Sequence, residues 1–200
     1  MSSTESTERA PRLLVFAGPN GSGKSSITVK VPVVGIYVNA GDIKRIRGCS
    51  DLAAAQEAEQ IRRILLAARK DLTFETVLST ARNLDFLRQA KQVGYAIQAV
   101  FVLTKDPAIN VARVRQRVAA GGHGVPEEKI ISRYQKSLGN LSELVRIADR
   151  TRVIDNTGEL PELICEVEQD RVRILENIYW RKEEILALLA RKSLPDGAAR

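Results

Sequence analysis

The sequence predicts an α/β fold of three layers, α/β/α, with a mainly parallel five-stranded sheet at its centre. Short apolar runs alternate along the chain with segments of helical spacing, which is the order of elements found in parallel sheets covered by helices. The first apolar run also leads directly into a glycine-rich turn. Because ligands bind such sheets at the carboxyl ends of the strands, the polar residues that follow each strand are the first candidates for a site.

The five strands are expected at 12–18, 35–41, 72–79, 95–104 and 150–158. Helical patterns cover 51–70, about 81–92, 106–122 and 125–148, and continue after the fifth strand to about Leu194. We therefore expect a disordered lead-in over 1–11, a core over 12–158 with a helical lid at about 113–134, and a helical segment over 159–200 with a long C-terminal helix.

The composition indicates a folded cytoplasmic protein. Of the 200 residues, 44% are hydrophobic and 28% charged, and no run approaches the roughly 18 apolar residues that a membrane helix needs. No apolar signal segment opens the chain. Cys49 and Cys165 lack metal-ligand spacing, which indicates reduced thiols. The net charge of +7 is interleaved with acids and the aromatic content is 4%, which favours small anionic ligands over nucleic acid.

A phosphate-binding loop follows the first expected strand. Residues 18–25 match the pattern G-x-x-x-x-G-K-S/T in full, between an expected strand and an expected helix. Glycines let successive backbone N–H groups face a phosphate, while Lys24 reaches the β- and γ-phosphates and the Ser25 hydroxyl ligates Mg²⁺. ATP and Mg²⁺ are therefore the expected cofactors. The expected phosphate-binding residues are Asn20, Gly21, Ser22, Gly23, Lys24, Ser25 and Ser26.

The rest of the sequence favours a kinase over other nucleotide-binding classes. An ABC-transporter ATPase would carry an LSGGQ-like signature and an apolar strand ending in Asp-Glu, and a GTPase would carry an NKxD-type motif; the sequence has none of these. A small-molecule kinase needs a carboxylate base, residues that hold the acceptor, and a mobile lid rich in arginine. The chain offers candidates for all three.

The candidates for the acceptor half lie after the second expected strand and within the third. Asp42 is either the base that takes the proton of the acceptor hydroxyl or the N-cap of a helix. Arg45, one turn further, either holds an anionic part of the acceptor or lies in solvent. Glu75 and Thr76 interrupt an apolar strand, where a carboxylate is costly unless it is paired or binds a ligand. We expect both to contact the acceptor.

The candidate lid surrounds the sequence GGHG at residues 121–124. Arg113 and Arg117 lie one helical turn apart on one face, and Arg133 follows the glycines. Arginines at this spacing commonly form a solvated face, but the glycine-rich hinge favours a closing segment. His123, the only histidine, is either a phosphate contact or a surface loop residue.

Six motifs follow one another between about Leu13 and Gly158: GPNGSGKSS, YVNAGDI, FETVLS, GYAIQAVFVL, RVRQRVAAGGHGVPEEKIISRYQKSLGNL and VIDNTG. In this order they resemble the zeta-toxin family of P-loop kinases. The resemblance implies that Lys24 holds ATP, Asp42 deprotonates the acceptor, and Glu75 with Thr76 lines the acceptor site.

The resemblance also implies that Arg117 contacts the transferred phosphate. His123 stands where the larger toxins carry an arginine, and a neutral imidazole lacks that fixed charge. Arg113 or Arg133 would then supply it.

Toxins of this family phosphorylate the 3′-hydroxyl of the amino sugar in UDP-N-acetylglucosamine. The resemblance therefore implies an ATP-dependent phosphotransferase with an alcohol acceptor such as this nucleotide sugar, and an antitoxin as protein partner. The alternative is a nucleotide-binding ATPase or assembly module whose long C-terminal helix, which carries Tyr179 and Trp180, engages a partner.

Overall fold

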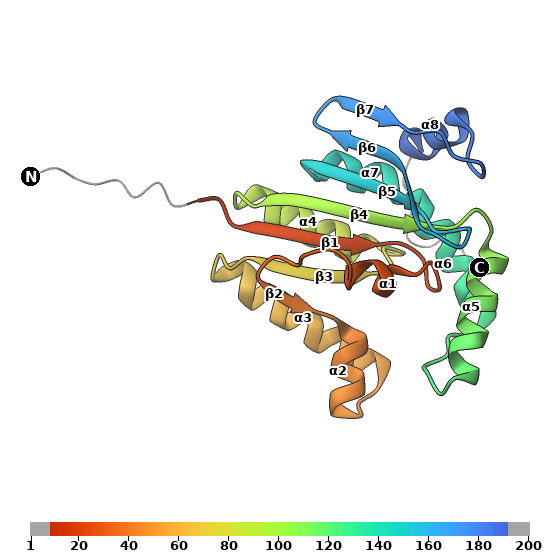
Figure 1. Cartoon of the computed structure of the whole chain (residues 1–200). Helices are drawn as coiled ribbons and strands as arrows, with labels where there is room; N and C mark the ends of the chain where they lie inside the picture. The colour runs from red at the N-terminus through yellow and green to blue at the C-terminus, as the bar shows by residue number, and fades with distance from the viewer. Residues whose placement is uncertain (1–8, 192–200) are drawn as a thin grey trace, which may run out of the picture.

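The computed structural model describes residues 9–191 and contains one sheet of seven strands in the order β2-β3-β1-β4-β5-β6-β7 (Figure 1). The strands are β1 Arg12–Ala17, β2 Ile36–Val38, β3 Leu72–Thr76, β4 Ala96–Leu103, β5 Arg150–Asp155, β6 Glu162–Glu168 and β7 Arg171–Ile174. The helices are α1 Lys24–Thr28, α2 Ala40–Arg47, α3 Asp51–Ala67, α4 Ala81–Gln92, α5 Pro107–Ala119, α6 Glu127–Gly139, α7 Leu141–Ile147 and α8 Lys182–Ala190.

The five strands expected from the sequence are all present and parallel. β1 pairs with β3 and β4, β2 pairs with β3, and β4 pairs with β5, each in parallel register. The class of fold predicted from the sequence is therefore confirmed. Since β1 is central among these strands, the loop that follows it emerges at the middle of the edge where the carboxyl ends of the strands meet.

Alternate side chains of β1 enter two separate cores. Leu13, Val15 and Ala17 belong to the larger core, which also takes in side chains of α3, α4, α6, α7 and α8. Leu14 and Phe16 face the opposite side, where a smaller core is closed by α1 and the segment that follows it. The two faces of the sheet are therefore covered unequally. The smaller core lies under α1, the helix that follows the phosphate loop.

The expected strand count and the long C-terminal helix are wrong. Residues 162–174 form the antiparallel hairpin of β6 and β7 beside β5, and α8 is the only helix after it among the described residues. The pairing of β5 with β6 contains a bulge at Ile164, which leaves both Ile164 and Cys165 buried. The bulge breaks the alternation of apolar and polar residues that identifies a strand in a sequence.

The C-terminal part of the chain packs on its own domain. It continues the sheet beyond residue 158, and Trp180, Ile185 and Leu188 are buried in the larger core. The apolar face of α8 is therefore already covered, which weakens the alternative in which this helix engages a partner. Of the lead-in expected over 1–11, residues 1–8 lie outside the described residues. No helix within 9–191 is both long and apolar enough to cross a bilayer.

Candidate active site

The phosphate loop joins β1 to α1 in a backbone conformation that requires glycine. Gly18, Gly21 and Gly23 have φ values of 138°, 78° and 91°, in the region that residues with a Cβ rarely adopt. A Cβ on Gly18 would also lie 2.0 Å from the carbonyl oxygen of Val102, and one on Gly21 would lie 2.5 Å from that of Asn110. The glycines thus serve both the curl of the loop and its close approach to β4 and α5.

Two asparagines that the sequence analysis missed hold the loop from neighbouring elements. Asn110 on α5 donates a side-chain hydrogen bond of 2.6 Å to the carbonyl oxygen of Asn20. Asn156, which follows β5, donates one of 2.7 Å to the carbonyl oxygen of Ser22. A signal was present for Asn156, because it is a polar residue near the carboxyl end of an expected strand, where ligands bind. Asn110 lies within a helical pattern, and only the fold shows that it is buried.

Lys24 points back at its own loop. Its ammonium donates to the carbonyl oxygens of Gly18 and Pro19 over 2.7 and 3.0 Å. Burial lowers the pKa of Lys24 from 10.5 to about 8; nearby Arg117 lowers the pKa as well, while Glu75 raises it. The hydrogen-bond partners of this ammonium are neutral carbonyl oxygens. A polyphosphate bound in the loop would give it a negatively charged partner.

Glu75 lies against the phosphate loop. One carboxylate oxygen accepts a hydrogen bond from the Ser25 hydroxyl over 3.2 Å, and the other accepts from Thr28 over 2.8 Å and from Tyr37 over 2.6 Å. Burial raises the pKa of Tyr37, and its hydrogen bond to Glu75 raises it further, so the phenol remains a donor. Glu75 is therefore placed toward the donor phosphates, while the neighbouring Thr76 hydroxyl accepts from the backbone N–H of Leu78 over 2.9 Å.

The oxygens of Ser25 and Glu75 are the kind of ligand that Mg²⁺ prefers. The described residues contain no cluster of three or more histidine, cysteine or acidic side chains that would hold a metal by themselves.

Asp42 is not the N-cap of its helix, which is one of the two roles that the sequence left open. The N-cap of α2 is Asn39, whose side-chain oxygen accepts from the backbone N–H of Gly41 over 2.8 Å. Asp42 lies in the first turn of this helix with its side chain 47% exposed, and its carboxylate pairs with Arg45 over 3.1 Å. Arg45 is mostly exposed and does not line the cavity described next.

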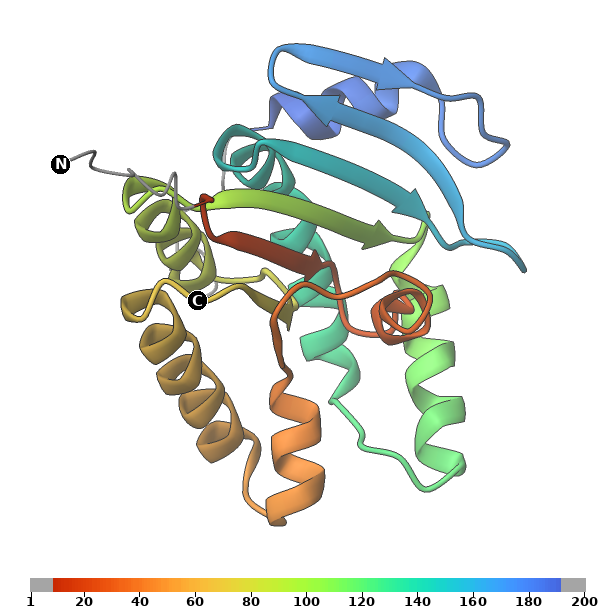
Figure 2. The same ribbon diagram turned by 60° about the vertical axis from the view of Figure 1, so that its left-hand side comes forward.

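A cavity of about 1100 Å³ brings most of the expected residues together. Figure 2 shows α2 and α3 extending past the sheet on the same side as α5 and α6, and the cavity is lined from both pairs of helices. Ser22 is buried beneath its lining. The sequence-predicted residues in the cavity wall are Asn20, Gly21, Gly23, Lys24, Ser25, Ser26, Asp42, Glu75, Thr76, Arg113, Arg117, His123 and Arg133.

The candidate lid is the pair α5 and α6 with the loop between them. Arg117 donates from Nε to the carbonyl oxygen of His123 over 3.1 Å, which ties the helix to the glycine-rich loop. Arg133 reaches the side-chain oxygen of Asn20 over 3.5 Å. Arg113 keeps a buried guanidinium nitrogen without a hydrogen-bond partner. All three arginines line the cavity together with the residues of the phosphate loop.

Arg62 on α3 is a further cation of the cavity wall that the sequence analysis missed. Its side chain lies over the rings of Phe74 and Phe86, is 8% exposed, and donates to Asn83 over 3.2 Å. Its Nε has no partner, and burial lowers the pKa of the guanidinium to about 10. In the sequence, Arg62 is indistinguishable from the exposed Arg63 beside it.

The sequence profile of the family described as Zeta toxin matches residues 40–162 of this chain. An uncharacterised protein of Haemophilus influenzae is 24% identical over 129 residues, which are 62% of this chain and 92% of that protein.

Two solved structures share the fold. The complex of AvrRxo1-ORF1 with AvrRxo1-ORF2 and ATP superposes with a TM-score of 0.68 and 15% identity, covering 98% of this chain and 68% of that one. The structure from the PezAT toxin–antitoxin system of Streptococcus pneumoniae has a TM-score of 0.56 and 14% identity, covering 94% and 86%.

Proposed function

Since this chain belongs to the zeta-toxin family, we propose that it is an ATP-dependent kinase that transfers the γ-phosphate to a hydroxyl group of a small molecule. The observation that carries the proposal is that Lys24, Asp42 and Arg117 line one cavity. A phosphate donor held by the loop and an acceptor held beside α2 fit there together. This arrangement suits transfer between two bound substrates better than hydrolysis.

The donor half is the phosphate loop. Lys24 is the cation for the β- and γ-phosphates, and the remaining loop residues bind phosphate through their backbone and hydroxyl groups. Ser25, with Glu75 behind it, would hold Mg²⁺, which supplies positive charge against the phosphate oxygens. The polar contacts of Glu75 favour this location over direct orientation of the acceptor.

In the acceptor half, Asp42 takes the proton of the acceptor hydroxyl. The acceptor oxygen then bonds to the γ-phosphorus, and the bond from that phosphorus to the bridging oxygen breaks, leaving ADP. Arg117, with Arg113, Arg133 and His123 around it, neutralises the charge on the transferred group. Because Arg45 pairs with Asp42, its proposed part is to hold the carboxylate in its orientation.

The acceptor that the family suggests is UDP-N-acetylglucosamine, with Thr76 in the cavity wall beside it. The AvrRxo1-ORF1 structure was solved with ATP and a partner protein, and the PezAT structure comes from a toxin–antitoxin system. By analogy we propose ATP as the donor, a toxin role, and an antitoxin partner for this chain.

The proposal is tested by incubating the protein with Mg·ATP and a bacterial metabolite extract, followed by mass spectrometry. A phosphorylated metabolite should form, and pure UDP-N-acetylglucosamine tests the named acceptor. The variant Asp42→Ala should keep ATP binding and lose transfer, whereas Asp170→Asn, an exposed carboxylate outside the cavity, should match the wild type. ADP formation without any new phosphometabolite, or transfer by Asp42→Ala at nearly the wild-type rate, would refute it.

A further inference from the structure

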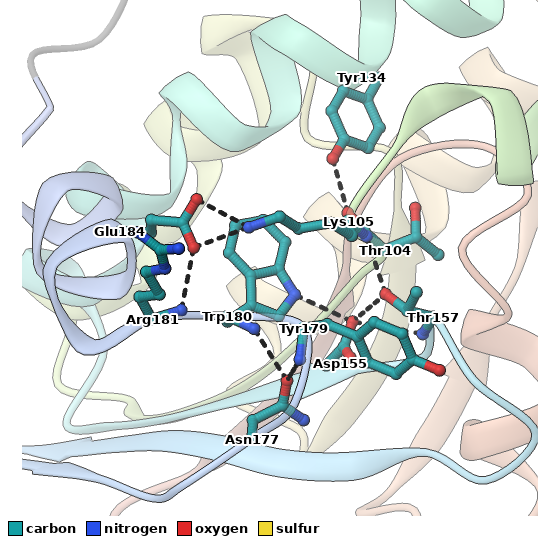
Figure 3. A network of polar contacts seen from close by, with 10 residues as sticks. All are labelled: Thr104, Lys105, Tyr134, Asp155, Thr157, Asn177, Tyr179, Trp180, Arg181 and Glu184. Atoms are coloured by element: carbon teal, nitrogen blue, oxygen red, sulfur yellow. Dashed lines mark hydrogen bonds and ion pairs between the residues drawn. The ribbon is translucent and has the colours of Figure 1, made fainter.

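A network of polar contacts joins the C-terminal part of the chain to the ends of β4 and β5. Its members, shown in Figure 3, come from four separate segments of the sequence, and we call them the C-terminal network. They are Thr104, Lys105, Tyr134, Asp155, Thr157, Asn177, Tyr179, Trp180, Arg181 and Glu184. Trp180 lies at the centre of this group and is 7% exposed.

The indole of Trp180 is bonded to a buried carboxylate. Its Nε1 donates to Asp155, which is 2% exposed, over 3.0 Å. The same carboxylate oxygen accepts from the hydroxyl and the backbone N–H of Thr157 over 2.5 and 3.2 Å. No lysine or arginine of the described residues pairs with Asp155, so its carboxyl group depends on these neutral donors, and the loss of any one leaves it underbonded.

Lys105 closes the network from the end of β4. Its ammonium lies 4.4 Å from the centre of the Trp180 ring and contacts both carboxylate oxygens of Glu184 over 2.7 Å. Its backbone N–H donates to the Thr157 hydroxyl over 2.8 Å. The indole is thus held on one side by a cation and at its edge by a carboxylate, which fixes it with respect to both strand ends.

The residue next to Asp155 holds the phosphate loop. The backbone N–H of Asn156 donates to Leu103 over 2.9 Å, and its side chain donates to the carbonyl oxygen of Ser22 over 2.7 Å. The space is tight, because a Cβ on Gly23 would lie 2.1 Å from the Asn156 amide nitrogen. Any shift of Asn156 therefore moves the loop or breaks its anchor.

We propose that Trp180 is a positioning residue for nucleotide binding, which acts through Asp155 and Asn156 on the phosphate loop. Trp180 touches none of the residues in the cavity wall by any hydrogen bond of the described chain, and it lies beyond residue 162, where the family profile ends. The proposal rests on the proposed function only in requiring that the loop bind ATP. It gives the C-terminal hairpin and α8 a part in the active site.

The test is the dissociation constant of Mg·ATP for purified variants, measured by calorimetry together with the melting temperature. Trp180→Phe keeps an aromatic ring at this position and removes the N–H, and should weaken ATP binding by about threefold to tenfold. Leu188→Ala removes a buried side chain of α8 from the same core and serves as the control. It should lower the melting temperature and leave ATP affinity unchanged.

A double-mutant cycle shows whether the effect passes through the anchor of the loop. Asn156→Ala should weaken ATP binding, and Trp180→Phe should have no further effect in that background. Equal effects of Trp180→Phe with and without Asn156, or a changed melting temperature with unchanged ATP affinity, would overturn the proposal. Absence of ATP binding by both wild type and Lys24→Ala would instead contradict the proposed function.

The protein carries its own probe, because Trp180 is its only tryptophan. Saturation with Mg·ATP should change the tryptophan fluorescence of the wild type, since the indole bonds to Asp155 and the adjacent Asn156 bonds to the loop. The same saturation should leave the fluorescence of Asn156→Ala unchanged. An identical response of both proteins would show that the indole and the loop are not connected by this route.

Discussion

The cavity and the C-terminal network differ in how completely their charged groups are paired. In the cavity wall, Arg62 and Arg113 each keep a buried guanidinium nitrogen without a partner. In the network, the Asp155 carboxylate accepts three hydrogen bonds, and Lys105 pairs with Glu184. Buried donors without partners cost stability, and a ligand that accepts from them would offset this cost in the cavity wall.

The difference also separates two kinds of residue that look alike in sequence. Lys24 and Lys105 both follow a central strand of the sheet at its carboxyl end. Lys24 is bonded only to loop carbonyls, whereas Lys105 has a carboxylate and an aromatic ring. The first is suited to receive an anion, and the second is suited to hold a structure in place.

The largest expected effect is on phosphoryl transfer by the lid. Arg117→Ala should reduce the transfer rate by about 10³-fold, because an arginine that neutralises the transferred phosphoryl group commonly contributes that much. Arg115→Ala is a matched control on the same helix, since Arg115 is exposed and pairs with Glu127 over 2.5 Å. Rates are measured from the phosphometabolite and from ADP. Equal rates for the two variants would remove Arg117 from the mechanism.

The pH dependence of ATP binding tests whether Lys24, which pairs with backbone carbonyl oxygens and with no carboxylate, binds the phosphates. Its pKa is lowered to about 8. Below this pH, Lys24 of the free protein is protonated and its positive charge attracts phosphate. Above this pH, Lys24 loses the proton and the charge. ATP affinity should therefore fall by up to about tenfold per pH unit above pH 8. Calorimetric titrations across this range check the slope. The arginine in Lys24→Arg stays charged across this range, so the ATP affinity of this variant should change little with pH. An equally steep fall of its affinity would show that the titration of another group causes the pH dependence.

The smallest effects are on stability, and they should differ between the two regions. Arg62→Met removes an incompletely paired buried cation, and should raise the melting temperature by about 2–4 °C, or about 1 kcal/mol, while lowering transfer. Lys105→Met breaks the pairing with Glu184 and Trp180 and should lower the melting temperature. Thermal denaturation of both variants measures the difference. The contrast between the regions fails if both substitutions shift the melting temperature in the same direction.

The parallel sheet and the phosphate loop were predictable because both depend on local order in the sequence. A short apolar strand that ends in glycines and is followed by Lys24 and Ser25 requires no distant residue to be recognised. The hairpin of β6 and β7 was not predictable in this way. Its bulge at Ile164 exists only through pairing with β5, so the local pattern alone suggested helix.

The residues of the candidate site also fall into those that the sequence predicted and those that only the fold revealed. The sequence selected Asp42, Glu75 and Arg117, and the fold brought all three to one cavity. It left open whether Asp42 caps its helix, and Asn39 proved to be the cap. It gave no sign of Arg62, because burial of an arginine on an amphipathic helix depends on what packs against that helix.

By itself, the sequence determined a phosphate-binding loop after a central strand, an acid after the next strand and a basic segment with a glycine hinge, because each is encoded within a few consecutive residues. Only the tertiary structure decided which groups face each other. Glu75 lies against Ser25, Arg62 lacks a full set of partners, and Trp180 is bonded to Asp155. Contacts between residues far apart in the chain arise from packing, which no local pattern records.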